Sequence, residues 1–364
     1  MVARHKRYET GGPGVGHSAR KTVARVLTVL VTCAVAAVII FAGVCFLIFR
    51  GPSGAARDLV VTTLLETPAL DALPQVFLTD SQIADILARS SMGSVDVSVQ
   101  DPQLVDYRQE QEESRALDRN AVDLLVTDHA TFRAQLLVVN DPNRMRVAVP
   151  GEFGDRGLTI EELCGSNVAA IGAGLVDATR GEGGYPVGVV VCNGKARWLD
   201  TSEPGLYLVG FDGDGLLRII DIRGKADFEV EQVIKDEDIR HAVTVSDRVG
   251  DLSASFGPII VNGAVREYQG TGSGESARTA IGQRADGAVL LLTCSGNLLA
   301  GRAGATAQDL IAIMSGAGAV NACALSEGAR AQMVYEGETL AGGSGMFATG
   351  DRQLMPSAFV VGAR

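Results

Sequence analysis

The apolar and polar positions between residues 277 and 335 form a strand–helix–strand pattern. An apolar run at 289–294 is followed by a segment with helical spacing at 306–315 and by a second apolar run at 319–325. Turn-forming residues stand at the joints. Period-two and period-3.6 patterns in this order predict a β-α-β unit.

In such a unit the functional side chains usually follow the carboxyl ends of the strands. Ser295, Gly296 and Asn297 follow the first strand here, and Ser326, Glu327 and Gly328 follow the second. These two strand ends are therefore the primary candidates for catalytic or binding residues.

Other short apolar runs alternate with turns rich in Asn, Asp, Gly and Pro, which predicts many short strands. They lie at 134–139, 145–149, 168–171, 187–191, 195–199, 206–211, 216–222 and 258–261. Helical spacing predicts helices at 80–90, 158–163 and 228–243, the first capped by Thr79 and Gln82. We expect an α+β (mixed α/β) fold, with one many-stranded central sheet and helices packed on it.

Residues 26–49 contain no charged side chain, and six of the first 25 residues are basic. A helix of this length, at about 1.5 Å per residue, spans the roughly 30 Å core of a bilayer. The basic flank predicts a single-pass anchor with a cytoplasmic N-terminus and an extracellular C-terminal part. A cleaved signal peptide ending near Gly54, Ala55 and Ala56 is the alternative, although its apolar region is usually about 7–15 residues.

These patterns divide the chain into four parts. They are a basic cytoplasmic tail at 1–25, a transmembrane helix at 26–49, a linker or stalk with a short helix at 50–121, and a domain at 122–364.

The net charge and the spacing of cysteines and histidines restrict the classes of partner and cofactor. The net charge is −11 overall, and residues after 49 carry 26 basic and 42 acidic side chains, a charge of −16. This balance argues against nucleic acid as a partner. No Cys/His spacing is typical of zinc, and the glycine-rich segment 270–274 lacks the context of a dinucleotide loop, so we expect neither metal nor cofactor.

Four cysteines lie beyond the anchor, where oxidation is permitted. Three pairings are possible, and we expect Cys164–Cys192 and Cys294–Cys323. Four buried free thiols are the alternative.

Several segments together resemble the phosphodiester glycosidase family, in its bacterial membrane-anchored branch of exopolysaccharide biosynthesis proteins. They are LVVNDPNRMRVAV, PVGVVVCNGK, FGPIIVNG, GTGSGESARTAIGQRADGAVLLL, GAGAVNACAL and GDRQLMPSAFVV, in order over residues 132–361. ARTAIGQRADG is the most specific of them. The resemblance implies an extracellular protein that acts on or binds sugar-phosphate linkages of exopolysaccharide or cell-wall polymers.

The two strand ends depart from the family pattern. Family members typically have Asp-Gly-Arg at the first end and Asn-Leu-Asp-Gly-Gly at the second. Ser295 and Ser326 stand in place of the two aspartates. A serine hydroxyl cannot supply the charge or protons of a carboxylate in cleavage through an oxocarbenium-like state.

The resemblance also identifies the candidate site residues. Asp177, after the glycine loop, and Glu327, one position beyond the lost aspartate, are the candidate catalytic acids. The candidate binding residues are Arg278, Thr279, Gln283, Ser295, Asn297, Asn321, Ser326 and Arg330.

Each of the charged candidates also has a purely structural interpretation. Arg278 would hold carbonyl groups in a packed turn, Asp177 would cap its own loop, and Glu327 would be a solvated turn residue. Two hypotheses follow: a phosphodiester glycosidase, or an inactive descendant that binds a glycan or another envelope protein.

Overall fold

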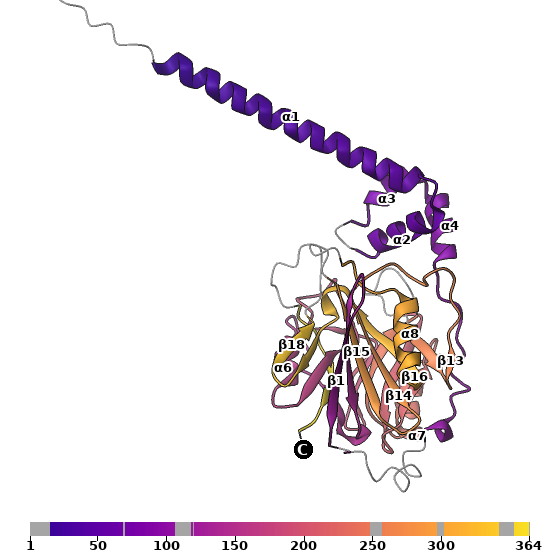
Figure 1. Ribbon diagram of the computed structural model, residues 1–364. Helices are drawn as coiled ribbons and strands as arrows, with labels where there is room; N and C mark the ends of the chain where they lie inside the picture. The colour runs from indigo at the N-terminus through magenta and orange to yellow at the C-terminus, as the bar shows by residue number, and fades with distance from the viewer. Residues whose placement is uncertain are drawn as a thin grey trace, which may run out of the picture. The chain divides into compact units, whose positions relative to one another are not determined.

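The computed structural model describes residues 15–67, 70–105, 118, 120–247, 257–296, 302–341 and 353–363. The chain forms two compact units, Met1–Arg57 and Asp58–Arg364. Figure 1 shows the second unit as a body rich in strands.

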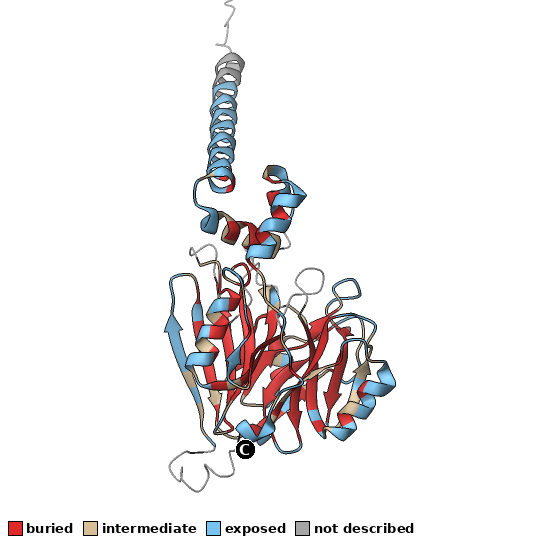
Figure 2. Cartoon of the chain, turned by 90° about the vertical axis from the view of Figure 1, so that its right-hand side faces the viewer, coloured by how far each residue is buried: buried red, intermediate tan, exposed pale blue. Residues whose placement is uncertain are grey.

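The first unit is dominated by the helix α1, Val15–Arg50. Its stretch Val23–Arg50 is long and apolar enough to cross a membrane, and it is exposed over nearly all of its length (Figure 2). Length and composition fit either a membrane span or a signal sequence.

The second unit contains several antiparallel sheets in place of the single central sheet expected from the sequence. The seven-stranded sheet has the order β1 (Val122–Asp128), β2 (Arg133–Val139), β15 (Val289–Ser295), β14 (Arg278–Arg284), β16 (Ala319–Glu327), β12 (Pro258–Val261) and β13 (Ala264–Val265). One five-stranded sheet has the order β10 (Leu217–Asp221), β9 (Leu206–Asp212), β11 (Ile239–Ser246), β7 (Val189–Cys192) and β8 (Lys195–Leu199). The other has the order β18 (Glu338–Ala341), β17 (Met333–Tyr335), β4 (Ala169–Gly172), β19 (Ala358–Val361) and β3 (Met145–Ala148). A short pair joins β5 (Leu175–Val176) to β6 (Pro186–Val187).

Short helices precede the first strand and connect later strands of this mixed α+β fold. Among the described residues, the α-helices after α1 are α2 (Gly54–Leu65), α3 (Leu73–Phe77), α4 (Asp80–Arg89), α6 (Ile160–Cys164), α7 (Asp227–Asp236) and α8 (Ala307–Gly316). The 3-10 turns are η1 (Pro102–Leu104), η2 (Pro142–Arg144) and η4 (Gly328–Arg330).

The strand–helix–strand pattern is confirmed, with one strand inserted in it. β15 and β16 each pair antiparallel with β14, so they run parallel to one another on its two sides. The connecting helix α8 is preceded by the N-cap Thr306, whose hydroxyl accepts the amide of Asp309 in a capping box. Its apolar face and alternate residues of β15, such as Leu290 and Leu292, form one core, whereas Val289 and Leu291 belong to a larger one.

Local signals read from the sequence are confirmed elsewhere too. The capping box of Thr79 and Gln82 starts α4. The β7–β8 and β12–β13 hairpins turn at Asn193 and Asn262, each followed by glycine, with positive φ at all four positions. Asn-Gly is the preferred pair for such turns because both residues tolerate left-handed backbone.

The helix expected at 228–243 is wrong in its second half. α7 ends at Asp236, and Asp238 has a φ of +47°, which breaks the helix. β11 then pairs with β9 on one side and β7 on the other. Its β-branched residues Val243, Thr244 and Val245 are buried, so packing between two strands decided the conformation.

The expected disulfides are also wrong, since all six cysteines are free thiols. Cys294 lies on β15 and Cys323 on β16, with β14 between them. Two strand spacings amount to roughly 10 Å, well beyond the reach of a disulfide. Cys164 and Cys192 belong to different hydrophobic clusters.

Gln283 joins two of the sheets. This fully buried side chain of β14 accepts the amide of Leu217 at 2.7 Å and donates to the carbonyls of Gly215 at 2.8 Å and Gly287 at 3.1 Å. It therefore holds the β9–β10 hairpin against the seven-stranded sheet.

Replacing Gln283 with Met should lower the free energy of unfolding by about 2–4 kcal/mol, because buried backbone groups lose their partners. Thermal unfolding followed by the fluorescence of Trp198, the single tryptophan, measures the change. Gln232→Met, at an exposed position of α7, should leave Tm unchanged. Equal Tm values for the two variants would contradict a cross-linking role.

Candidate functional site

The two strand ends singled out by the sequence lie at the same end of the seven-stranded sheet. Thr279 of β14 pairs with Ser326 of β16, and Ser295 of β15 pairs with Arg133 of β2. Asn297 lies outside the described residues.

A row of buried polar residues crosses four adjacent strands at this end. Gln135 pairs with Thr293, Thr293 pairs with Thr279, and Thr279 pairs with Ser326. Directly paired residues share a sheet face. We call these four residues the polar row; none is more than 7% exposed.

Ser326 is fixed within the structure. Its hydroxyl lies 2.7 Å from the Thr279 hydroxyl and 3.1 Å from the carbonyl oxygens of Gly172 and Arg330. The Thr279 hydroxyl also accepts the amide of Ser326 at 3.1 Å. None of these contacts offers a base that would activate a nucleophile.

The other half of the polar row is not satisfied. The Thr293 hydroxyl and the side-chain oxygen Oε1 of Gln135 are buried without a hydrogen-bond partner in the described part of the chain. Such a group costs about 1–3 kcal/mol when nothing compensates it. Ser295 lies two residues further along β15, on the same face and nearer the strand end, with its hydroxyl 3.5 Å from the Arg133 carbonyl.

Arg278 points to the opposite face of the sheet from Thr279, since neighbours on a strand alternate. It is 1% exposed and is surrounded by protein groups. Its Nε donates to the Ala305 carbonyl at 2.8 Å, and its Nη2 donates to the Gly274 carbonyl at 2.9 Å. It also forms ion pairs with Glu66 at 2.6 Å and with Glu327. These contacts agree with the structural interpretation of Arg278, and its role as a substrate contact stays a prediction.

Glu327 and Asp177 are both engaged elsewhere. The Glu327 carboxylate is 11% exposed and pairs with Arg278. Asp177, just after β5, accepts the hydroxyl of Thr179 at 2.6 Å and its amide at 2.9 Å. The Thr179 hydroxyl holds the pKa of Asp177 below its usual range, which is unsuited to a general acid near neutral pH.

Gln283 and Asn321 lie toward the other end of the sheet. They pair with each other across β14 and β16, and Asn321 accepts the amide of Asn262 at 3.0 Å. Five residues of strand, roughly 17 Å, separate Gln283 from Arg278. The structure therefore does not bring these two predicted binding residues to the strand ends.

Arg330 ends η4, directly after the second strand end. Its Nε is buried without a hydrogen-bond partner, and no acidic side chain among the described residues pairs with it. Burial lowers the pKa of this guanidinium. Among the described residues, no carboxylate neutralises the guanidinium of Arg330, which follows the end of β16.

Sequence reasoning missed Glu66, Gln135 and Thr293. Glu66 lies just past α2, in a segment read as a linker, and its partner Arg278 is 212 residues away. Gln135 and Thr293 sit in strands that were predicted, but only the register shows that they adjoin Thr279.

The chain belongs to the phosphodiester glycosidase family, whose sequence profile matches residues 165–361. Among solved structures it is similar to the zebrafish N-acetylglucosamine-1-phosphodiester alpha-N-acetylglucosaminidase catalytic domain auto-inhibited by its pro-peptide. That match has a TM-score of 0.52 and 15% identity, and it covers 69% of this chain and 85% of the other. A hypothetical protein from Synechocystis matches with a TM-score of 0.40 and 14% identity, over 67% of this chain and 62% of the other. At 15% identity, the likeness to the zebrafish domain is one of fold. No curated protein matches the chain.

Replacing Arg278 with Met should destabilise the protein by about 3–5 kcal/mol, because two buried carboxylates lose the guanidinium they contact. Arg133→Met removes a half-exposed pair with Asp128 and should cost under about 1 kcal/mol. The Tm of each variant measures this. An unchanged Tm for Arg278→Met would mean that the residue is not structural.

Replacing each of two threonines of the polar row with valine should change the free energy of unfolding in opposite directions. Thr293→Val removes an unpartnered hydroxyl and should raise the free energy of unfolding by about 1 kcal/mol. Thr279→Val breaks the bonds to Ser326 and should lower it by about 1–3 kcal/mol. A lower Tm for Thr293→Val would show that its hydroxyl is already satisfied.

Proposed function

We propose that this protein binds a sugar phosphodiester at the polar row without cleaving it. The observation that carries the proposal is the composition of the row, which offers hydroxyl and amide groups and no carboxylate. Two of its groups, on Thr293 and Gln135, are buried without partners. A protein keeps such groups at a cost to stability, and sugar hydroxyls are suitable partners for them.

Cleavage of a sugar–phosphate bond needs groups that stabilise positive charge and move protons, usually two carboxylates. The two acids predicted from the sequence serve other contacts, Glu327 with Arg278 and Asp177 with Thr179. This supports binding over hydrolysis.

Arg330 is the proposed contact for the phosphate. Its carbonyl is 3.1 Å from the Ser326 hydroxyl, so its backbone adjoins the polar row. An arginine can bind a phosphodiester through two parallel hydrogen bonds. The lack of an acidic partner among the described residues supports this role.

We further propose that residues 26–49 anchor the protein in the cell membrane, with the N-terminus cytoplasmic and the domain outside. The basic residues before the apolar stretch support this orientation. The ligand would then be an exopolysaccharide or a cell-wall polymer with sugar-phosphate linkages. Another envelope protein carrying such a glycan is a second possible partner.

Hydrolysis of the same linkages is the second candidate function, favoured by membership of the family. On this view Asp177 and Glu327 would be the acids, and both would have to leave their present contacts.

The test uses the full-length protein in detergent micelles with a methyl diester of N-acetylglucosamine 1-phosphate. We expect no release of N-acetylglucosamine, and binding by calorimetry that weakens at least about tenfold in Arg330→Gln, as for a lost charge-assisted hydrogen bond. Arg197→Gln, an exposed arginine of β8, should bind like the unaltered protein.

Sugar release that is lost in Asp177→Asn or Glu327→Gln would establish hydrolysis and overturn the proposal. Unchanged affinity in Arg330→Gln would show that this residue does not contact the ligand. Unchanged affinity in Thr293→Val would show that the ligand does not bind at the polar row.

A further inference from the structure

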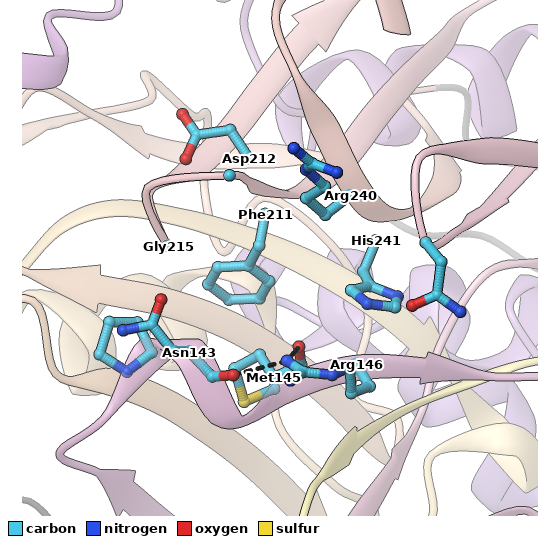
Figure 3. Close-up of a pocket in the computed structure, with 11 residues that line it drawn as sticks. Asn143, Met145, Arg146, Phe211, Asp212, Gly215, Arg240 and His241 are labelled. Carbon is cyan, nitrogen blue, oxygen red and sulfur yellow. Dashed lines mark hydrogen bonds between the residues drawn. The ribbon is translucent and has the colours of Figure 1, made fainter. Parts of the chain in front are cut away.

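A hollow of about 300 Å³ has none of the polar-row residues in its lining. Figure 3 shows the residues that line it. Gly215, one of its lining residues, accepts a hydrogen bond from Gln283, near the end of β14 remote from Arg278. None of the predicted site residues that the structure describes lines it. The walls come from η2 and β3, the β7–β8 turn, the β9–β10 turn and the start of β11.

His241 lines this hollow as a neutral hydrogen-bond donor. Its Nδ1 accepts the amide of Val147 at 3.2 Å, so the proton of the neutral ring is on Nε2. Burial, aided by the positive charges of Arg146 and Arg240, lowers the pKa of His241 to about 4. The ring therefore stays neutral at pH 7.

Two arginines accompany His241 in the lining, as Figure 3 shows. Arg146 donates to the carbonyls of Asn143 at 2.5 Å and Met145 at 2.8 Å, and it has no acidic partner among the described residues. Arg240 pairs with Asp238 at 2.9 Å, but both side chains are more than half exposed. Such an exposed pair is weak and can be exchanged for a ligand at little cost.

The carboxylate in the lining, Asp212, does not cancel this charge. Its Oδ1 accepts the amides of Asp214 and Leu216 at 3.0 Å, and its Oδ2 lies 3.3 Å from a guanidinium nitrogen of Arg218. These contacts form the β9–β10 turn. The hollow thus combines two guanidinium groups and a ring N–H with an acid that is already paired.

We propose that this hollow binds an anionic group, a phosphate or carboxylate on a sugar, between Arg146, Arg240 and the Nε2–H of His241. Its volume is within the range of small-ligand pockets. Charge-assisted hydrogen bonds from two arginines suit a group with several acceptor oxygens. The site is separate from the polar row, and the inference does not depend on the function proposed for that row.

The test is calorimetry on the full-length protein in detergent, with glucose 1-phosphate, glucuronate, inorganic phosphate and uncharged glucose as probes. We expect at least one sugar anion to bind and glucose not to bind. The first two probes distinguish a phosphate site from a carboxylate site. Arg146→Gln and the exposed Arg240→Gln should each weaken binding about tenfold or more, and Arg197→Gln should not.

Two variants of His241 separate its two nitrogens. His241→Asn places an acceptor near the Nδ1 position for Val147 and removes the donor, so Tm should change little and affinity should fall. His241→Gln places an amide near Nε2 and loses the Val147 contact, so Tm should fall and affinity should be largely kept.

Unchanged affinity in Arg146→Gln and Arg240→Gln would overturn the proposal. So would the absence of binding by every anion at millimolar concentration, or binding lost only in Arg330→Gln. The last result would place the anion at the polar row instead. Failure of the polar row to bind a phosphodiester would leave this test unaffected.

Discussion

The structure around the ends of β15 and β16 depends on the ion pairs of one buried guanidinium, that of Arg278. It joins the segment after α2, through Glu66, to the end of β16, through Glu327, and it also holds the Ala305 carbonyl ahead of α8. Removing either partner of a buried ion pair leaves the other charge uncompensated, which strongly destabilises the fold. Glu327 therefore contributes to this framework through its ion pair with Arg278, which points to the sheet face opposite Thr279.

The alternation of side chains along β14 then divides the strand end into two environments. Arg278 faces the ion pairs beside α8, whereas Thr279 faces the polar row. In that row Ser326 bonds to Thr279 and the Gly172 carbonyl, while Thr293 has no partner in the described chain. The hydroxyl and amide groups of the polar row can form hydrogen bonds, but they cannot act as general acids or bases. The polar row at the strand ends is buried, and Ser295 and Ser326 stand where the resemblance predicts aspartates.

Local patterns in the sequence predicted much of the fold, because caps and turns depend on neighbouring residues. Thr79 with Gln82 and Asn262 with Gly263 are examples. The second half of the helix expected at 228–243 became β11, because burial between two strands outweighed helical spacing. The candidate site was less predictable. Its location at two strand ends followed from the pattern, but the pairing of Thr293 with Gln135 and of Arg278 with Glu66 depends on register and on contacts between distant segments.

The most direct measurement is an experimental structure of the full-length protein with an N-acetylglucosamine phosphodiester bound. The result predicted here is an intact diester, with its sugar hydroxyls bonded to Thr293 and Gln135 and with Arg278 still paired to Glu66 and Glu327. A cleaved product beside Asp177, or a Glu327 carboxylate released from Arg278 and directed at the sugar, would contradict it.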